Sequence, residues 1–300
     1  MDKGAEYGLI KLIASDMDGT LLNSRHEIDN ESVEAIKNSE EAGIIFAIST
    51  GREYGNVKPF LEKHNIKCQC ILMNGAEYRD EDGTIIDVIN IDKDIASKII
   101  DILNKNKVSA RIFTNDGVYT SDSEEQALNE MIYRTMSLNP GLTEEEAIEE
   151  AKRQSYFMKL KYIDDMKEFL DSNIEIRKFI AFHKDMELIN EIKKEIGKIA
   201  EVAVSSSFAD NIEVTHMTAQ KGIILAKAAQ RMGIDKSEVM VIGDSCNDYS
   251  MFEIFEESVA MENAIPEIKK IAKHITDTND NLGVAKAINE VVEKLKMSKN

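Results

Sequence analysis

Residues 9–22 read LIKLIASDMDGTLL, and no other part of the chain says as much about its architecture. The stretch opens with a mostly apolar run, 9–15, which is typical of a buried β-strand. Polar residues follow at once as DMDGT over 16–20. In an open parallel sheet, ligands bind beyond the carboxyl ends of the strands. The stretch therefore predicts a buried strand that ends at a binding site.

The chain continues with an alternation of helices and further apolar strands. Asp29 or Asn30 can cap a helix that continues to Ala42, and Gly43 fits its C-terminal end. A strand over 44–48, a helix over 53–64 and a strand over 70–73 are expected next. This alternation predicts an α/β fold with a Rossmann-like parallel sheet and right-handed crossovers.

The pattern changes in the middle of the chain and then returns. Strands are expected over 84–89, 109–114, 118–120, 157–162, 178–182, 202–206 and 212–215, with helices over 95–106, 124–137, 143–153 and 186–199. Several of these strands alternate polar and apolar residues, which suits a sheet with one wet face. From Lys221 onward, a helix and the strand over 239–242 return to the alternation of helices and apolar strands seen near the N-terminus. We expect a core of residues 1–82 and 216–300, split after its third strand by an α+β domain over 83–215.

Composition narrows the class of protein. Of the 300 residues, 43% are hydrophobic, so the chain is not generally disordered. The formal charge of −18 does not attract nucleic acid or an anionic membrane. We see no apolar signal segment and no membrane-spanning run, and three cysteines indicate reduced thiols. We therefore expect a cytoplasmic protein without nucleic-acid or membrane partners, and a monomer by default.

Two more polar clusters follow predicted strands. Ser49, Thr50, Gly51 and Arg52 come after the second strand, and residues 243–248, GDSCND, follow the strand over 239–242. Since the carboxyl ends of parallel strands share one edge of the sheet, these clusters are expected to meet the first one.

The acidic residues suggest a cation site. On a strand, Asp16 and Asp18 would point to the same face, where two carboxylates repel each other unless something offsets them. Asp244 can add a third oxygen ligand for Mg²⁺. The alternative is a turn with solvated carboxylates. A calcium loop is set aside, because Leu21 stands where that loop needs glycine.

Thr50, Gly51 and Lys221 each have two interpretations. The hydroxyl and N–H groups of Thr50 and Gly51 can cap a helix or bind phosphate, since both use the same free N–H groups. Lys221 is a single cation that can serve a phosphate or lie on a solvated surface.

Four ordered motifs together resemble one family. They read DMDGTLL over 16–22, ISTGR over 48–52, AQKG over 219–222 and GDSCNDYSM over 243–251. This set resembles the haloacid dehalogenase-like (HAD) superfamily, and within it the Cof-type group of sugar-phosphate phosphatases. Ser245-Cys246 and Tyr249-Ser250 depart from the usual fourth motif without removing a catalytic group.

The resemblance implies a role for each motif. Asp16 would be the nucleophile that forms an aspartyl-phosphate, and Asp18 the general acid and base. Phosphate binding would fall to Met17, Thr50, Gly51, Lys221 and Asn247. Mg²⁺ would be held by Asp16, the Asp18 carbonyl and Asp244, with Asp248 as a direct or supporting ligand. Asn74, Gly75 and Arg52 would line the cleft; Arg52 pairs either with a nearby carboxylate or with solvent.

The implied function is a Mg²⁺-dependent phosphatase of small phosphorylated metabolites, such as sugar phosphates. Alternatives are a phosphomutase of the same superfamily or a phosphatase specific for pyridoxal phosphate or flavin mononucleotide. A phospho-accepting signalling module and a non-catalytic binder fit the motifs less well. Basic residues of the middle domain that either lie on its surface or contact the substrate are Arg111, Lys159, Lys161, Arg177 and His183.

Overall fold

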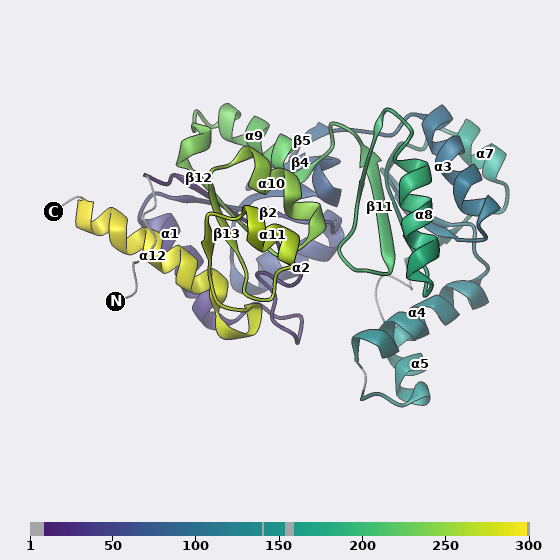
Figure 1. Ribbon diagram of the computed structural model, residues 1–300, viewed down its shortest axis with the longest axis horizontal. Helices are drawn as coiled ribbons and strands as arrows, with labels where there is room; N and C mark the ends of the chain where they lie inside the picture. The colour runs from purple at the N-terminus through teal and green to yellow at the C-terminus, as the bar shows by residue number, and fades with distance from the viewer. Residues whose placement is uncertain (1–8, 140, 154–158, 299–300) are drawn as a thin grey trace. The chain divides into compact units, whose positions relative to one another are not determined.

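The computed structural model describes residues 9–139, 141–153 and 159–298. These residues form two compact units (Figure 1). The core unit comprises the described residues of Met1–Ile89, Ser205–Phe208 and Thr215–Asn300. The inserted unit comprises those of Asn90–Val204 and Ala209–Val214.

The core unit is built on an eight-stranded sheet of order β14-β13-β12-β1-β2-β3-β4-β5. The strands from β14 to β3 are parallel, whereas β4 and β5 are antiparallel to their neighbours. Their bounds are β1 (Leu12–Ser15), β2 (Ile45–Ser49), β3 (Gln69–Leu72), β4 (Glu77–Arg79), β5 (Ile85–Val88), β12 (Val239–Gly243), β13 (Glu257–Ala260) and β14 (His274–Ile275).

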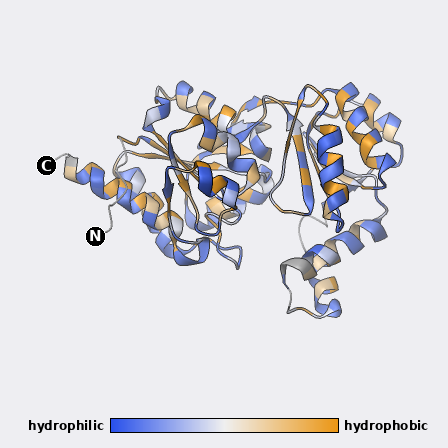
Figure 2. Cartoon of the chain, viewed as in Figure 1, coloured by the Kyte–Doolittle hydropathy of each residue, from blue (hydrophilic) through white to orange (hydrophobic). Residues whose placement is uncertain are grey.

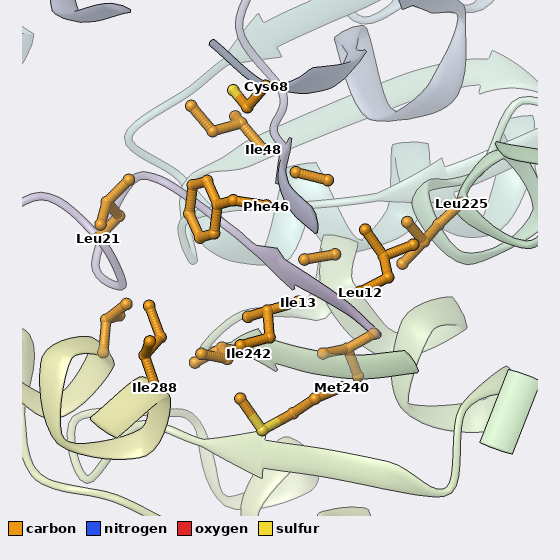
Figure 3. Close-up of a cluster of buried hydrophobic side chains, with 14 of the residues drawn as sticks. Leu12, Ile13, Leu21, Phe46, Ile48, Cys68, Leu225, Met240, Ile242 and Ile288 are labelled. Atoms are coloured by element: carbon orange, nitrogen blue, oxygen red, sulfur yellow. The ribbon is translucent and has the colours of Figure 1, made fainter. Parts of the chain in front are cut away.

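The central strands of this sheet are almost entirely apolar, which suits their complete burial. β1 and β12 read LIAS and VMVIG, and every residue in them is buried. Parallel strands covered by helices on both faces have no wet side, so they need no polar alternation. Ile13 of β1 lies beside Met240 and Ile242 of β12, Leu12 lies on the side of Leu225, and Phe46 packs from β2 (Figure 3).

Helices cover the core sheet. They are α1 (Asn30–Glu41), α2 (Tyr54–His64), α9 (Lys221–Arg231), α10 (Tyr249–Ile254), α11 (Pro266–Ile271) and α12 (Gly283–Ser298), with short 3₁₀ turns η1 (Met73–Gly75), η2 (Lys236–Glu238), η3 (Cys246–Asp248) and η4 (Asn279–Asn281). α1 packs on α12, and α9 packs on α10 (Figure 1). None of the helices in the described part of the chain has the length and apolar character needed to cross a bilayer.

The inserted unit has its own six-stranded sheet, of order β10-β11-β9-β6-β7-β8. The strands are β6 (Ala110–Thr114), β7 (Gly117–Thr120), β8 (Lys161–Tyr162), β9 (Ile176–Phe182), β10 (Val202–Ser205) and β11 (Asn211–His216). The helices are α3 (Lys93–Lys105), α4 (Glu124–Leu138), α5 (Glu144–Arg153), α7 (Met166–Asp171) and α8 (Met186–Ile196). α3 and α8 bury isoleucines in a separate core and show polar outer sides (Figure 2).

The start of the inserted unit differs from the sequence-based expectation. The strand expected over 84–89 was assigned to the insertion, but β5 pairs with β4 at the edge of the core sheet. The core unit therefore continues to Ile89, so a hairpin separates the third strand from the inserted unit. β4 was missed because a three-residue strand has no readable periodicity. Part of the strand expected over 157–162 lies outside the described residues.

Candidate active site

The polar clusters meet at one edge of the core sheet. β1 lies between β2 and β12, with Ser15 level with both Ile48 and Ile242. The next residue, Asp16, donates its backbone N–H to the Ile242 carbonyl (3.0 Å). This register brings the residues that follow all three strands together, as the position of carboxyl ends in a parallel sheet requires.

A fully buried lysine joins two of the clusters. Lys221 is the first residue of α9 and is 0% exposed. Its Nζ donates to Oδ1 of Asp16 (2.6 Å) and to Oδ1 of Asp248 (2.7 Å). Burial alone lowers the pKa of Lys221, but the two carboxylates outweigh burial and raise it. Lys221 is therefore charged, and the solvated-surface interpretation is wrong.

Asp248 holds this lysine and its own loop at the same time. While Oδ1 accepts from Lys221, Oδ2 accepts the backbone N–H groups of Asp244 (2.9 Å) and Ser245 (3.0 Å). Gly243 is required beside it, because a Cβ there would lie 2.6 Å from the Asp248 carboxyl carbon. Asp248 thus ties the end of β12 to the start of α9.

Three carboxylates crowd together around Lys221. Asp16, Asp244 and Asp248 each offer an oxygen, and these oxygens lie within 4.8 Å of one another. Burial, and then the charge of Asp248, raise the pKa of Asp244 to about 7. Burial also raises the pKa of Asp16, against the opposing effect of Lys221. One lysine does not balance three carboxylates, and a set of hard oxygen donors fits a Mg²⁺ ion.

Asp18 has a different partner. Arg52 donates from Nε to Oδ2 of Asp18 (2.8 Å) and from Nη2 to Oδ1 (2.6 Å). Of the two partners considered for Arg52, the structure has the carboxylate. Burial would raise the pKa of Asp18, but this two-pronged hydrogen bond and the charge of Arg52 leave it lowered. Asp18 is therefore ionised in this structure.

Thr20 is a site residue to which the sequence assigned no role. Its Oγ1 donates to Oδ1 of Asp244 (2.8 Å), which orients that carboxylate. Gly19 has φ +76°, and a Cβ there would lie 2.5 Å from Oδ2 of Asp244. Both residues belong to the DMDGT stretch, so the motif itself was the signal.

The second strand contributes Thr50 and the turn beside it. Thr50 and Met17 are fully buried. The Thr50 carbonyl accepts the backbone N–H of Asn74 (3.0 Å), and its hydroxyl accepts that of Arg52 (3.3 Å). Gly75 has φ +102°, and a Cβ there would lie 2.8 Å from the Gln220 backbone. Asn74 and Gly75 therefore lie against the start of α9.

Asn247 contacts a segment that no motif had placed in the site. Its Nδ2 donates to Oδ1 of Asn74 (3.4 Å) and to Oγ of Ser207 (3.2 Å). Ser245 also donates from Oγ to the Ser207 carbonyl (3.1 Å). No sequence pattern connects Ser207 with the fourth motif, 40 residues away along the chain.

Two of the five basic residues of the inserted unit, Arg111 and Lys161, have acidic partners within that unit. Arg111 is buried and bonds to Asp122 (2.8 Å) and Glu130. Arg177 is buried as well, so neither of these two arginines lies on the surface, which was one of the two positions expected for them. Lys161, by contrast, is exposed and pairs with Asp116. Lys159 is exposed and His183 is half-buried.

These features define an α/β protein with an acidic site at the carboxyl edge of its parallel sheet. A family model described as haloacid dehalogenase-like hydrolase matches residues 13–288. The chain belongs to this family, and the resemblance inferred from its four motifs is confirmed.

Named relatives and a solved structure agree with this assignment. The chain is 32% identical over 283 residues to the 5-amino-6-(5-phospho-D-ribitylamino)uracil phosphatase YwtE of Bacillus subtilis, covering 94% of this chain and 98% of the relative. It is 24% identical over 263 residues to the HMP-PP phosphatase of Yersinia pestis, covering 87% of each. The structure of a haloacid dehalogenase-like hydrolase from B. subtilis matches with a TM-score of 0.83 and 32% identity, over 93% of this chain and 99% of that one.

The raised pKa of Asp244 predicts how stability depends on pH in the presence of EDTA. The folded protein keeps a proton on Asp244 up to about pH 7, whereas an unfolded aspartate loses it near its ordinary value of 3.8. Unfolding then releases a proton, so the contribution of Asp244 to the free energy of unfolding falls as pH rises through this window. The slope is at most about 1.4 kcal/mol per pH unit.

Urea unfolding of the wild type and Asp244→Asn between pH 4 and pH 8 checks this expectation. The amide does not titrate, so the difference between the two proteins removes the histidines and distant acids and reports Asp244 together with Asp16, whose pKa the charge of Asp244 also raises. The wild type should lose stability relative to the variant as pH rises. A difference that stays constant with pH would contradict the raised pKa.

Proposed function

We propose that this chain is a Mg²⁺-dependent phosphatase that hydrolyses phosphate monoesters of small metabolites through an aspartyl-phosphate. The observation that carries the proposal is the Asp16 carboxylate, held by the buried Lys221 beside Asp244 and Asp248. A carboxylate with a fixed cation at its side is positioned to attack phosphorus and to have the resulting charge stabilised. The names of the relatives support the reaction class.

Asp16 and Asp18 divide the chemistry between them. Oδ1 of Asp16 is engaged by Lys221, which leaves the other carboxylate oxygen to attack. An Asp16 O–P bond forms while the ester P–O bond breaks, and Asp18 gives its proton to the departing alkoxide. Water then attacks the same phosphorus, loses a proton to Asp18 and releases Asp16 and phosphate.

The remaining motif residues hold the phosphoryl group. Its oxygens would accept from the Thr50 hydroxyl, the Lys221 ammonium, the Asn247 amide and the backbone N–H groups of Met17 and Gly51.

The acidic cluster would hold the cation. Mg²⁺ on Asp16, the Asp18 carbonyl and Asp244 would screen the repulsion between the nucleophile and the phosphate. Asp248, with both oxygens already bonded, supports Lys221 and the Asp244 loop from behind.

Asp18 must gain a proton before it can act as an acid. Arg52 keeps it ionised in this structure. An anionic phosphate bound nearby favours the neutral carboxyl, so we infer that substrate binding raises the pKa of Asp18 and weakens its bond to Arg52.

Asp18→Asn is expected to separate the two halves of the reaction. Turnover of an alkyl phosphate should fall by about 10²- to 10⁴-fold, because no group protonates the alkoxide or deprotonates the water. p-Nitrophenolate leaves without a proton, so p-nitrophenyl phosphate should give a rapid burst of about one equivalent per enzyme, followed by slow turnover. Rapid mixing with absorbance detection measures the burst. Unimpaired steady turnover of the alkyl phosphate would contradict both roles of Asp18.

The substrate class follows from the relatives and the resemblance. YwtE is named for a substrate with a phosphate on a ribityl chain, and we infer that this chain also takes a phosphorylated polyol, sugar or related metabolite. Pyridoxal phosphate and flavin mononucleotide belong in the same test. We further infer that the inserted unit acts as the cap that selects the organic part of the substrate, as the resemblance implies.

The deciding experiment is phosphate release from a panel of these monoesters with Mg²⁺ or with EDTA. The proposal expects release that depends on the metal and differs among substrates. Phosphoryl transfer that requires a bisphosphorylated sugar, with little free phosphate, would instead identify a phosphomutase. No reaction of any monoester in folded protein with Mg²⁺ would overturn the proposed function.

A further inference from the structure

Residues Ser205–Phe208, the first of which is the last residue of β10, cluster with the core unit and not with the inserted unit. The chain enters them from β10 and leaves them towards β11, both strands of the inserted unit's sheet. They carry none of the four motifs, the nearest of which begins at Ala219.

Within this segment, Ser207 forms two hydrogen bonds with residues of the fourth motif. Its Oγ accepts from Nδ2 of Asn247 (3.2 Å), and its carbonyl accepts from Oγ of Ser245 (3.1 Å). Both partners lie in the fourth motif, beside the short turn η3. Ser205 adds a weaker bond, with its Oγ 3.4 Å from Nδ2 of Asn74.

The orientation of the Asn247 amide depends on these bonds. Asn247 is only 9% exposed, and its two amide hydrogens face Ser207 and Asn74. The bond to Asn74, at 3.4 Å, is long for an N–H donor, so that hydrogen is weakly held. Ser207, through the shorter bond, sets the plane of the amide and leaves the second N–H ready to exchange Asn74 for a phosphoryl oxygen.

We propose that Ser207 is a positioning residue of the active site, which orients the Asn247 amide for phosphate binding. This inference rests on the proposed function. A fixed donor binds an anion better than a rotating one, because the cost of ordering the side chain has already been met. The effect should therefore appear in phosphate affinity more than in the chemical step.

Ser207→Ala removes the hydroxyl and keeps the backbone carbonyl that Ser245 uses. With p-nitrophenyl phosphate and Mg²⁺, KM should rise about three- to tenfold, as expected for the loss of one hydrogen bond, while kcat changes less than twofold. The inhibition constant of inorganic phosphate should rise by the same factor. Ser207→Thr, which retains a hydroxyl, should restore most of the affinity.

Two further variants exclude a merely structural effect. Ser206→Ala makes the same change one residue away, where the side chain has no hydrogen bond to Asn74, Ser245 or Asn247 among the described residues. It should leave KM and kcat unchanged. In an Asn247→Ala background, Ser207→Ala should cause no further rise in KM or in the phosphate inhibition constant, because Ser207 acts through Asn247.

The outcomes separate the inference from the proposed function. An unchanged phosphate inhibition constant in Ser207→Ala, or equal effects of Ser207→Ala and Ser206→Ala, would overturn the role of Ser207 while leaving a working phosphatase. If Ser207→Ala weakened phosphate affinity in the Asn247→Ala background as much as in the wild type, the role of Ser207 would also be overturned, since Ser207 would then not act through Asn247. No Mg²⁺-dependent phosphate release by the wild type would overturn the proposed function and this inference together.

Discussion

Asp16→Asn is expected to reduce phosphate release by at least about 10⁴-fold. The amide has nearly the shape of the carboxylate but no anionic oxygen with which to attack phosphorus. It still presents an oxygen to Lys221, which donates to Asp16 at 2.6 Å in the wild type. The fold should therefore survive while the reaction stops, and steady-state phosphate release with Mg²⁺ measures the loss.

A matched change elsewhere tests whether this loss is specific. Asp101 lies exposed on α3 and forms no ion pair within the described part of the chain. Asp101→Asn should keep wild-type activity. Circular dichroism and thermal unfolding should show Asp16→Asn folded. Hydrolysis near the wild-type rate in folded Asp16→Asn would remove Asp16 from the role of nucleophile.

Lys221→Met is expected to lower the free energy of unfolding by about 3–5 kcal/mol and to abolish activity. Methionine fills similar space, but Asp16 and Asp248 then face each other without the cation that bonds to both. Removing one partner from a buried ion pair leaves an uncompensated buried charge, which is the costly case. Urea unfolding in EDTA at pH 7.5, followed by circular dichroism, measures the change.

An exposed lysine provides the control for this variant. Lys58 pairs with Glu62 at 3.5 Å on the surface of α2, where its side chain is 53% exposed. Lys58→Met should change stability by no more than about 0.5 kcal/mol. The deficit of Lys221→Met should shrink towards pH 5, since burial already raises the pKa of Asp16 and this carboxylate can then take up a proton. A deficit below about 1 kcal/mol at pH 7.5 would mean that the ion pairs of Lys221 do not stabilise the core unit.

Much of the fold was predictable because the parallel sheet uses local signals. Buried strands such as β1 and β12 are short apolar runs, and the polar residues of the site follow them directly in the sequence. Hairpin β4–β5 was less predictable, since β4 is three residues long and its pairing with β3 is a tertiary contact. β5 was recognised as a strand but assigned to the wrong sheet for the same reason.

The candidate site was also predictable only in its local features. Each motif could be recognised from the sequence, but the hydrogen-bond partner of each side chain could not be predicted. The Arg52–Asp18 bond was one of two open possibilities, because the tertiary packing decides whether a carboxylate or only water lies within reach of an arginine. Thr20 had no assigned role, although it lies inside the first motif, since its partner Asp244 is 224 residues away.

By itself, the sequence determined the α/β class, the order of the four motifs and the family, because all three can be recognised from short-range patterns of apolar and polar residues. Only the tertiary structure decided which charges meet. Lys221 and Asp16 are 205 residues apart, and Ser207 and Asn247 are 40 apart. Such pairs form when strand register and helix packing bring distant segments within hydrogen-bonding distance, and no local pattern encodes that distance.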